Sequence, residues 1–549
     1  MKTLTLHDKI AQLIFIPFYG AAPNTATREY RKFVRLVRET HVGGLVLVNW
    51  SNGHVMQKAE PYALAAFINR MQRLAPIPLM VSGDFERGAS MRVDNTTVFP
   101  HAMAFGATGD PSLARFEGEV TAREARALGV QWVFFPVADV NSNPDNPIIN
   151  IRSFGENPQD VAKFVTAFIE GARSDPKTRV LTTAKHFPGH GDTSVDTHMN
   201  LATISAGPEQ LRRVELVPFE AAIRAGVDSV MTAHIAVPAL DAPDVPATTS
   251  RAIITGLLRE QLGFKGIVVT DALEMGGIKS YSAGDAAVKA LEAGVDVLLM
   301  TPDPEAALRA VMAAVRSGRL SAKRIDESVE RVLDAKVLTG LDRKRFVDVD
   351  AIADSVNSPE ANRRAQEIAD RAVTLVKNDR NLIPLAAPAK TCFVVLAESR
   401  SSTSGQAFQQ ELKRRMQSAQ ICMLDPTMPL PVIEPACENF VVMAFASVSA
   451  YAGEVALRGD YPTLIDQLVA TGKPVALVAM GSPYLLRNFP KVSAYLATFS
   501  TVPPSEIAAL KALLGEIPIH GRLPVTIPGS AKYGDGIQLP VRPPTVTSR

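Results

Sequence analysis

The sequence predicts an α/β protein made of a (β/α)8, TIM-like barrel followed by a smaller, doubly wound α/β sandwich domain. Eight short apolar runs alternate with helix-like segments in the first 300 residues, polar side chains follow several of these runs, and a second alternation begins after a charged stretch. We assign residues 1–340 to the barrel, 341–360 to a linker, and 361–549 to the sandwich domain with an irregular tail.

The eight runs are nearly uninterrupted in apolar character, as expected of parallel strands that are buried on both faces. A helix pattern lies between successive runs. In one of them, Ser250 is the expected N-cap and Gly263 the expected end. The eight predicted strands cover residues 13–19, 43–49, 78–84, 130–138, 180–186, 229–235, 266–272 and 295–300.

Polar residues lie at or just beyond the ends of the third to seventh runs. Enzymes with this barrel place their chemistry at the C-terminal ends of the strands. Any one of these residues has an equally good explanation as a loop cap, but their convergence on one rim predicts an active site. The residues are Asp84, Asp139, Lys185, His186, His234 and Asp271.

After the charged linker, a second series of strand-like runs alternates with helix patterns at 408–416 and 504–515. This alternation favours a doubly wound α/β domain. It contains no glycine loop with the spacing needed to bind phosphate. The expected strands cover residues 392–398, 421–425, 439–447, 474–481 and 494–500.

The composition excludes several classes of protein. The 58 Lys and Arg nearly balance the 56 Asp and Glu, so no basic stripe indicates nucleic acid. No stretch approaches the ~18 apolar residues that a membrane-spanning helix needs. Asp8 and Lys9 directly precede the only apolar run of the N-terminus, which does not resemble a signal peptide. We expect a cytoplasmic protein; an exported protein whose signal has been removed is the alternative.

The three cysteines, Cys392, Cys422 and Cys437, all lie in the last third of the chain. Their odd number and wide spacing match neither a disulfide framework nor a zinc motif. We expect them to be reduced and structural.

Residues 184–198, AKHFPGHGDTSVDTH, form the most specific segment. Its histidines and aspartates raise the question of a metal. However, the segment lacks H-E-x-x-H, and Pro188 among glycines makes it a loop and not a ligand-bearing helix. We therefore predict no metal and no cofactor. The favoured interpretation is a strand end that binds a polar ligand, followed by a mobile loop that carries Asp196 and His198.

Asp196 and His198 are two residues apart, so their side chains share one side of an extended stretch. A carboxylate beside an imidazole fixes its tautomer and favours its charged form, as a general acid requires. A surface pair with no task is the alternative.

Asp271 ends the seventh run and is placed to attack an anomeric carbon. Glu274 is the rival nucleophile, although a structural role suits it better.

Residues 5–340 resemble the catalytic barrel of family-3 glycoside hydrolases, in particular the bacterial β-N-acetylglucosaminidase branch, and residues 360–530 resemble that family's second domain. The family motif K-H-F-P-G-H-G-D-T-x-x-D-[ST]-H is matched at every specified position by residues 185–198. The resemblance implies an enzyme that cleaves terminal N-acetylglucosamine. It also implies Asp271 as the nucleophile and His198 as the acid/base, with Asp196 as its partner.

By the same resemblance, five residues bind the sugar: Asp84, Arg92, Arg152, Lys185 and His186. Asp84 and Arg92 keep the spacing of the family's D-Q-E-G-G-x-V-x-R segment, and Arg152 begins its R-S-F-G segment. Between Asp84 and Arg92 the chain departs from the family, with Phe85 in place of Gln and Arg87 in place of the first Gly. The bulkier side chains in this tight turn put the neighbouring sugar subsite in doubt. We expect an altered preference for the aglycone.

Three other functions stay open at this stage: a glycan-binding module without activity, a β-glucosidase, and an N-acetylglucosaminide phosphorylase. A β-glucosidase is expected to take its acid from the second domain, whereas residues 185–198 supply one inside the barrel. A neutral histidine does not repel phosphate, so phosphorolysis competes with hydrolysis. The predicted partner is a carbohydrate, such as a peptidoglycan or chitin fragment. The sequence implies neither an oligomeric state nor a natural aglycone.

Overall fold

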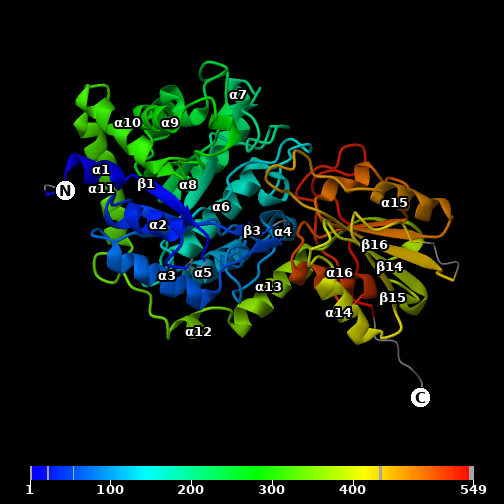
Figure 1. Ribbon diagram of the computed structural model, residues 1–549. Helices are drawn as coiled ribbons and strands as arrows, with labels where there is room; N and C mark the ends of the chain where they lie inside the picture. The colour runs from blue at the N-terminus through cyan, green and yellow to red at the C-terminus, as the bar shows by residue number, and fades with distance from the viewer. Residues whose placement is uncertain (1–2, 21–23, 53–54, 432–435, 543–549) are drawn as a thin grey trace.

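The computed structural model describes residues 3–20, 24–52, 55–431 and 436–542. Residues 1–2 of the expected barrel and 543–549 of the expected tail lie outside the described residues. The barrel, coloured blue to green, lies beside the sandwich domain, coloured yellow to red (Figure 1). Within the described ranges, no helix is both long and apolar enough to cross a membrane.

Eight parallel strands close into the predicted barrel. They pair in the orders β12-β1-β2-β5-β6 and β11-β9-β7. Parallel bridges from Trp132 to Leu181 and from Val269 to Val297 join the two groups. The strands are β1 (Ile14–Phe18), β2 (Gly44–Leu47), β5 (Met80–Gly83), β6 (Trp132–Val133), β7 (Thr183–Phe187), β9 (Ser229–Thr232), β11 (Ile267–Thr270) and β12 (Leu298–Leu299). Each predicted run contains one of them.

The fourth strand is much shorter than its apolar run, which extends over 130–138. Only Trp132–Val133 pairs regularly, because Pro136 has no N–H to donate to a neighbour. The rest of the run stays beside β7 through single hydrogen bonds. Thr183 N donates to Phe135 O at 3.0 Å, and Ala138 N donates to Lys185 O at 2.7 Å.

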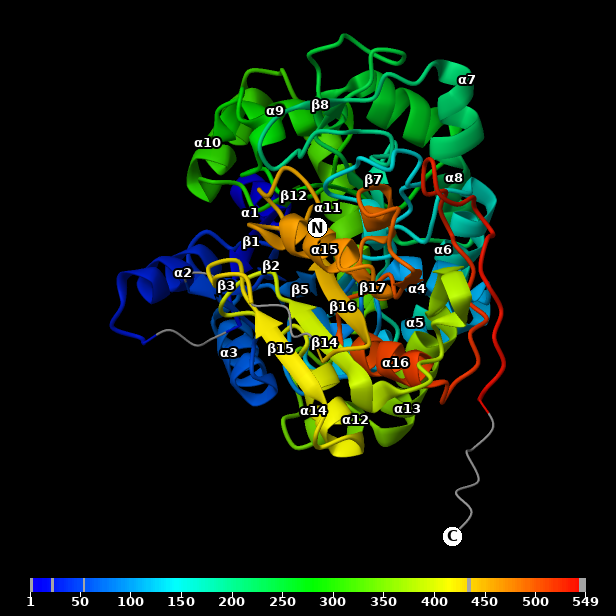
Figure 2. The ribbon, with the colours of Figure 1, turned by 90° about the vertical axis from the view of Figure 1, so that its right-hand side faces the viewer.

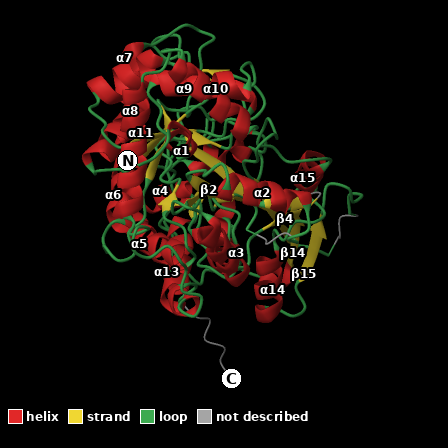
Figure 3. Cartoon of the chain, turned by 60° about the vertical axis from the view of Figure 1, so that its left-hand side comes forward, coloured by secondary structure: helices red, strands yellow, loops and turns green. Residues whose placement is uncertain are grey.

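Helices surround the strands, as Figure 3 shows in red and yellow. Their starts follow from the sequence: Asn157 caps α6 by accepting from Gln159 N and Asp160 N, directly before a proline. Ser250 Oγ accepts from Ile253 N at 3.1 Å, as predicted. The helices are α1 (Leu6–Ala11), α2 (Arg28–Arg38), α3 (Pro61–Leu74), α4 (Ala102–Thr108), α5 (Pro111–Ala127), α6 (Pro158–Ala172), α8 (Leu216–Arg224), η5 (Ala252–Gln261), α9 (Ala283–Ala293), α10 (Pro304–Arg316) and α11 (Ala322–Leu338).

The second domain is a six-stranded sheet in the order β13-β18-β17-β16-β14-β15. Only β13 is antiparallel to its neighbour, and its run was not predicted. The strands are β13 (Thr374–Asn378), β14 (Thr391–Leu396), β15 (Gln420–Leu424), β16 (Asn439–Ala446), β17 (Val475–Gly481) and β18 (Ala494–Ala497). The predicted α/β sandwich is confirmed.

Two apolar cores flank this sheet. Helices α14 (Gln406–Arg415) and α16 (Pro503–Leu514) pack on one face, and α15 (Tyr461–Ala470) packs on the other. Figure 2 shows this domain in front of the barrel, with α15 above the sheet and α14 and α16 below it in the view. Helix α4 of the barrel contributes Met103, Ala104 and Ala107 to the core on the α15 side of the sheet. The two domains therefore share apolar contacts.

The stretch expected to be a linker is packed against the barrel. It contains the short helix α12 (Ile352–Ser355), and α13 (Pro359–Ala372) follows. The Asn69 side chain binds the backbone of Val347 in both directions, at 2.9 and 2.7 Å. The segment therefore covers part of the barrel surface.

The expectation of three reduced cysteines is wrong for two of them. Cys392 and Cys437 form a disulfide with a Cα–Cα distance of 5.7 Å, and only Cys422 is a thiol. The register of β14 and β16 is the reason, because it sets Cys392 opposite Phe440, close to Cys437 in the chain. The odd number of cysteines in the sequence does not reveal a disulfide between residues that neighbouring strands bring together.

Candidate active site

The predicted site residues gather at the C-terminal rim of the barrel. Asp84 directly follows β5, and Lys185 and His186 lie in β7. Asp271 directly follows β11. Arg152 ends the short helix η2 (Asn150–Arg152) in the connection after β6. The charged site residues therefore meet at the rim that the strand ends predicted.

Asp84 binds two of the predicted sugar-binding cations. Its Oδ2 lies 2.7 Å from Arg92 Nη2, and its Oδ1 lies 2.8 Å from Lys185 Nζ. Burial alone would raise the pKa of Asp84, but the charges of Lys185 and Arg92 outweigh burial and lower the pKa to about 2. Asp84 is therefore an acceptor for hydroxyl groups at any ordinary pH.

Glu86 is a member of this network that the sequence did not single out. Its carboxylate accepts two hydrogen bonds from Arg152, each of 2.8 Å, and lies 2.6 Å from Lys185 Nζ. Lys185 thus lies between two carboxylates. Burial lowers the pKa of Lys185, but Asp84 and Glu86 more than offset it and leave the pKa above its usual value.

His186 is oriented by the fully buried carboxylate of Asp139. Nδ1 of His186 lies 2.7 Å from Asp139 Oδ2, while Asp139 Oδ1 accepts the backbone N–H groups of His186 and His190. Asp139 thereby holds the ring and the start of the following loop together. Its role is positional, and its place at a strand end was the signal in the sequence.

Asp271 is half-buried at the rim, and its Oδ1 accepts the N–H of Ala272 at 2.7 Å. Burial raises the pKa of Asp271, but His186, His234 and this N–H outweigh it, so the pKa lies below its usual value. His234 also donates from Nε2 to the Ala272 carbonyl at 3.0 Å. The carboxylate is held as an anion, which a nucleophile requires.

Asp196 and His198 form the predicted dyad. Asp196 Oδ1 lies 2.8 Å from His198 Nδ1 and accepts the N–H of His198 at 2.9 Å. The Asp196 side chain is almost fully buried, whereas His198 is 22% exposed. A carboxylate on Nδ1 keeps a proton on that nitrogen, so Nε2 is the ring nitrogen that is left to gain and lose a proton.

The loop that carries the dyad is docked, although its glycines led us to expect a mobile segment. Gly276 N donates to His198 O at 2.9 Å, and Gly277 N donates to Thr197 O at 3.0 Å, which fixes the dyad to the loop after Asp271. At Gly191, a Cβ atom would lie 1.6 Å from Val140 O. The glycine therefore permits close packing against the backbone of Val140.

The sandwich domain completes the surroundings of the dyad. The N–H of Tyr451 donates to Asp196 Oδ2 at 2.9 Å, and the Tyr451 ring centroid lies 5.2 Å from that of His198. Tyr451 adopts a positive φ of 67°. The contact joins residues 255 positions apart, and nothing in the sequence indicated it.

Glu274, the rival nucleophile, is exposed, and it has no hydrogen-bond partner among the described residues. It therefore lacks the histidine surroundings of Asp271. No group of three or more His, Cys, Asp or Glu in the described part of the chain is arranged to hold a metal ion.

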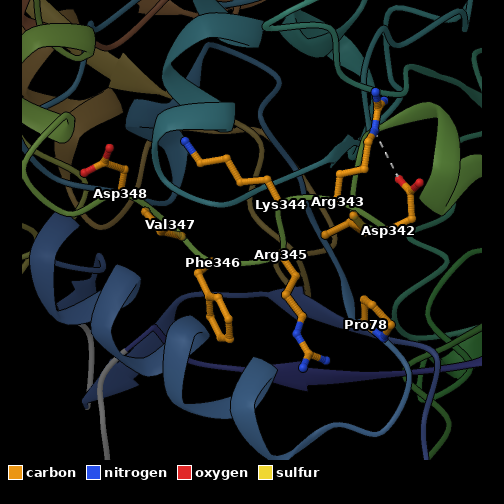
Figure 4. Close-up of a pocket in the computed structure, with 9 residues that line it drawn as sticks. Pro78, Asp342, Arg343, Lys344, Arg345, Phe346, Val347 and Asp348 are labelled. Atoms are coloured by element: carbon orange, nitrogen blue, oxygen red, sulfur yellow. Dashed lines mark ion pairs between the residues drawn. The ribbon is translucent and has the colours of Figure 1, made fainter.

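A basic pocket lies elsewhere, between the barrel and the segment that follows α11 (Figure 4). Pro78 and residues 341–348 line it. Arg343 is paired with Asp342 at 3.7 Å. None of the predicted site residues contributes to this pocket, so its chemistry is separate from that of the rim.

Comparison with known proteins gives two family-model matches. The model described as glycosyl hydrolase family 3 N-terminal domain matches residues 5–335, and the corresponding C-terminal domain model matches residues 373–546. Together they span both parts of the fold.

Similar proteins include one named β-N-acetylglucosaminidase/β-glucosidase from Cellulomonas fimi, 30% identical over 94% of this chain and 93% of its own length. A β-hexosaminidase A from Pseudoalteromonas piscicida is 31% identical over 83% of this chain and 84% of its own. A solved family-3 β-N-acetylglucosaminidase from Paenibacillus sp. str. FPU-7 superposes with a TM-score of 0.83 at 32% identity, covering 96% of this chain and 99% of that one. The β-glucoside phosphorylase BglX superposes with a TM-score of 0.85 at 25% identity, covering 96% and 95%.

Proposed function

Because the chain belongs to glycosyl hydrolase family 3 and is a glycosidase for β-linked glycosides, we propose that it removes terminal β-linked N-acetylglucosamine with retention of configuration. The observation that carries this proposal is the docking of the His198–Asp196 dyad onto the Asp271 loop through Gly276 and Gly277. This docking sets the proposed acid/base beside the loop that carries Asp271, the proposed nucleophile.

In the first step, Asp271 attacks the anomeric carbon while the proton on His198 passes to the departing glycosidic oxygen. A covalent glycosyl-Asp271 ester and the free aglycone result. In the second step, neutral His198 takes a proton from water, which attacks the same carbon and releases Asp271. Asp196 holds the ring through Nδ1 and stabilises the imidazolium. Asp84, Arg92, Arg152, Lys185 and His186 bind the sugar hydroxyls.

The choice of sugar draws its support from the relatives. Proteins named β-N-acetylglucosaminidase or β-hexosaminidase align over most of both chains. The name of the Cellulomonas fimi relative also includes β-glucosidase. A β-glucoside is therefore the appropriate substrate for comparison. The placement of the acid/base inside the barrel favours the N-acetylglucosaminide.

Phosphorolysis is the second candidate, supported by the likeness to a β-glucoside phosphorylase. In the second step the base is a histidine, which is neutral at that moment and does not repel an incoming phosphate. The first step is the same in both reactions. The acceptor alone distinguishes them.

Product analysis tests both candidates. The protein is incubated with 4-nitrophenyl N-acetyl-β-glucosaminide or β-glucoside, with and without phosphate. We expect free N-acetylglucosamine as the main product and a lower rate on the glucoside. N-acetylglucosamine 1-phosphate as the main product would establish phosphorolysis. Binding without any release of nitrophenol would indicate a glycan-binding module.

We predict that the sandwich domain supplies no catalytic acid. Glu398 and Glu454 flank the loop that carries Tyr451, and Glu398 holds this loop through Ser447 at 2.9 Å. Each change to glutamine should lower kcat/KM by less than about tenfold, because general acid catalysis is worth roughly 10²–10⁴-fold and His198 provides it. A larger loss in either folded variant would favour the β-glucosidase arrangement.

The Tyr451 ring should make a small contribution through the dyad. Tyr451→Ala removes the ring that packs on His198 but keeps the N–H that binds Asp196. Such ring contacts are worth about 0.5–1.5 kcal/mol, so kcat/KM should fall roughly 2- to 12-fold. Tyr533→Ala, another exposed tyrosine of the same domain, is the control and should leave kcat/KM unchanged. No change in the Tyr451 variant would show that the ring does not support the dyad.

A further inference from the structure

Two cations beside the sugar-binding network have no hydrogen-bond or ion-pair partner among the described residues. Arg87 lies in the turn between Asp84 and Arg92, and Lys58 follows the short strand β4 (Val55–Gln57). The segment after Lys58 runs along this turn, because Ala59 N donates to Arg92 O at 2.8 Å and Asp94 N donates to Ala59 O at 2.9 Å. We refer to Arg87 and Lys58 as the cation pair.

The two carboxylates of the sugar-binding network are already occupied. Asp84 binds Arg92 and Lys185, and Glu86 binds Arg152 and Lys185. Among the described residues, neither side chain of the cation pair has an ion pair or a hydrogen bond. The Nε atom of Arg92 is also buried without a partner.

The environment of Arg87 and Lys58 disfavours their charged forms. Burial, followed by the charge of Arg92, lowers the pKa of Arg87 to about 10, although Glu86 acts in the opposite direction. Burial, followed by the charge of Arg87, lowers the pKa of Lys58, and only Asp94 acts in the opposite direction. Half-buried cations that repel one another are costly unless an anion joins them. Arginine is suited to this task because its planar fork binds two oxygens of one oxyanion.

The cation pair lies away from the nucleophile. Asp271 interacts electrostatically with His186, His234 and His198, whereas Arg87 interacts with Arg92, Glu86 and, beside the sandwich domain, His101. Nδ1 of His101 lies 2.8 Å from Ser500 Oγ in that domain. Strand β5, which precedes the turn of Arg87, is four strands from β11 in either direction around the barrel, so the cation pair lies across the rim from Asp271.

We propose that the cation pair binds an oxyanion carried by the terminal sugar at its end remote from the anomeric carbon, as in a sulfate or phosphate ester of the 6-hydroxyl group. This proposal deepens the proposed function and rests on it for the orientation of the sugar. It also places the effect of the altered turn on the glycone and not, as expected from the sequence, on the aglycone.

Titration calorimetry on the full chain tests the proposal. The ligands are N-acetylglucosamine, its 6-sulfate and its 6-phosphate, each measured with the wild type, Arg87→Gln, Lys58→Gln and the exposed outer-helix control Arg316→Gln. In the wild type and the control, both esters should bind about tenfold more tightly than the neutral sugar, because each gains charge-assisted hydrogen bonds. Arg87→Gln should remove most of this ratio, and Lys58→Gln should reduce it.

Inorganic sulfate and phosphate distinguish an ester from a separate ion. If the cation pair serves the ester, either ion should bind weakly and compete with it. The proposal is overturned if the esters bind no better than the neutral sugar, if both variants keep the wild-type ratio, or if only the inorganic ions respond to Arg87→Gln. Binding is read without turnover, so an Arg87-dependent preference in a protein that hydrolyses no N-acetylglucosaminide would refute the proposed function alone.

Discussion

Replacing Asp271 with alanine should lower kcat by roughly 10⁴-fold or more and leave the protein folded. The Asp271 carboxylate is held as an anion and lies close to His186, His234 and His198. It lies half-buried beyond the end of β11, outside the apolar core, so its loss creates no cavity there. kcat with an aryl N-acetylglucosaminide and the midpoint of thermal unfolding are the two measurements.

Glu274→Ala is the matched control for Asp271→Ala, because Glu274 lies three residues further along the same loop and is exposed. This variant should keep kcat within about tenfold of the wild type. If Asp271→Ala retains comparable activity, the nucleophile has been misassigned.

Removing the dyad should have the second largest effect. His198→Ala or Asp196→Ala should lower kcat/KM by about 10²–10⁴-fold for substrates with poor leaving groups. Activated aryl glycosides should be partly spared in the first step, because their departing oxygen depends less on protonation. Both variants should also lose the wild-type pH profile of kcat/KM, because the proposed acid/base dyad is no longer intact.

Asp192→Ala is the control for the dyad, since Asp192 lies in the same loop but its side chain is not hydrogen-bonded to His198. Its pH profile should match that of the wild type. The dyad assignment would be refuted if His198→Ala and Asp196→Ala both kept the wild-type pH profile and the wild-type dependence on the leaving group.

Local patterns predicted much of the fold. Each of the eight apolar runs contains a barrel strand, because parallel strands buried on both faces leave continuous apolar stretches in the sequence. Their ends were less predictable: β6 is short because Pro136 interrupts the ladder. Strand β13 was missed, and it is the antiparallel edge strand of its sheet.

The residues of the site likewise divide into those that the sequence predicted and those that it did not. The Asp196–His198 pair was predictable from a spacing of two residues, and the sugar-binding residues follow a recognisable motif. Their contacts with a sugar stay predictions. Glu86 meets Arg152 across 66 positions, and Tyr451 meets Asp196 across 255. The Cys392–Cys437 disulfide depends on the neighbouring strands β14 and β16. Such contacts are created by tertiary packing, which local spacing does not contain.

The most direct test of the central claim is to trap the covalent intermediate. A fluorinated N-acetylglucosaminide that forms the glycosyl ester quickly and hydrolyses slowly is added to the wild type, and the labelled peptide is identified by mass spectrometry. We predict a single label on Asp271, absent from Asp271→Ala. A label on Glu274 in the wild type, or any label on the Asp271→Ala variant, would contradict the account.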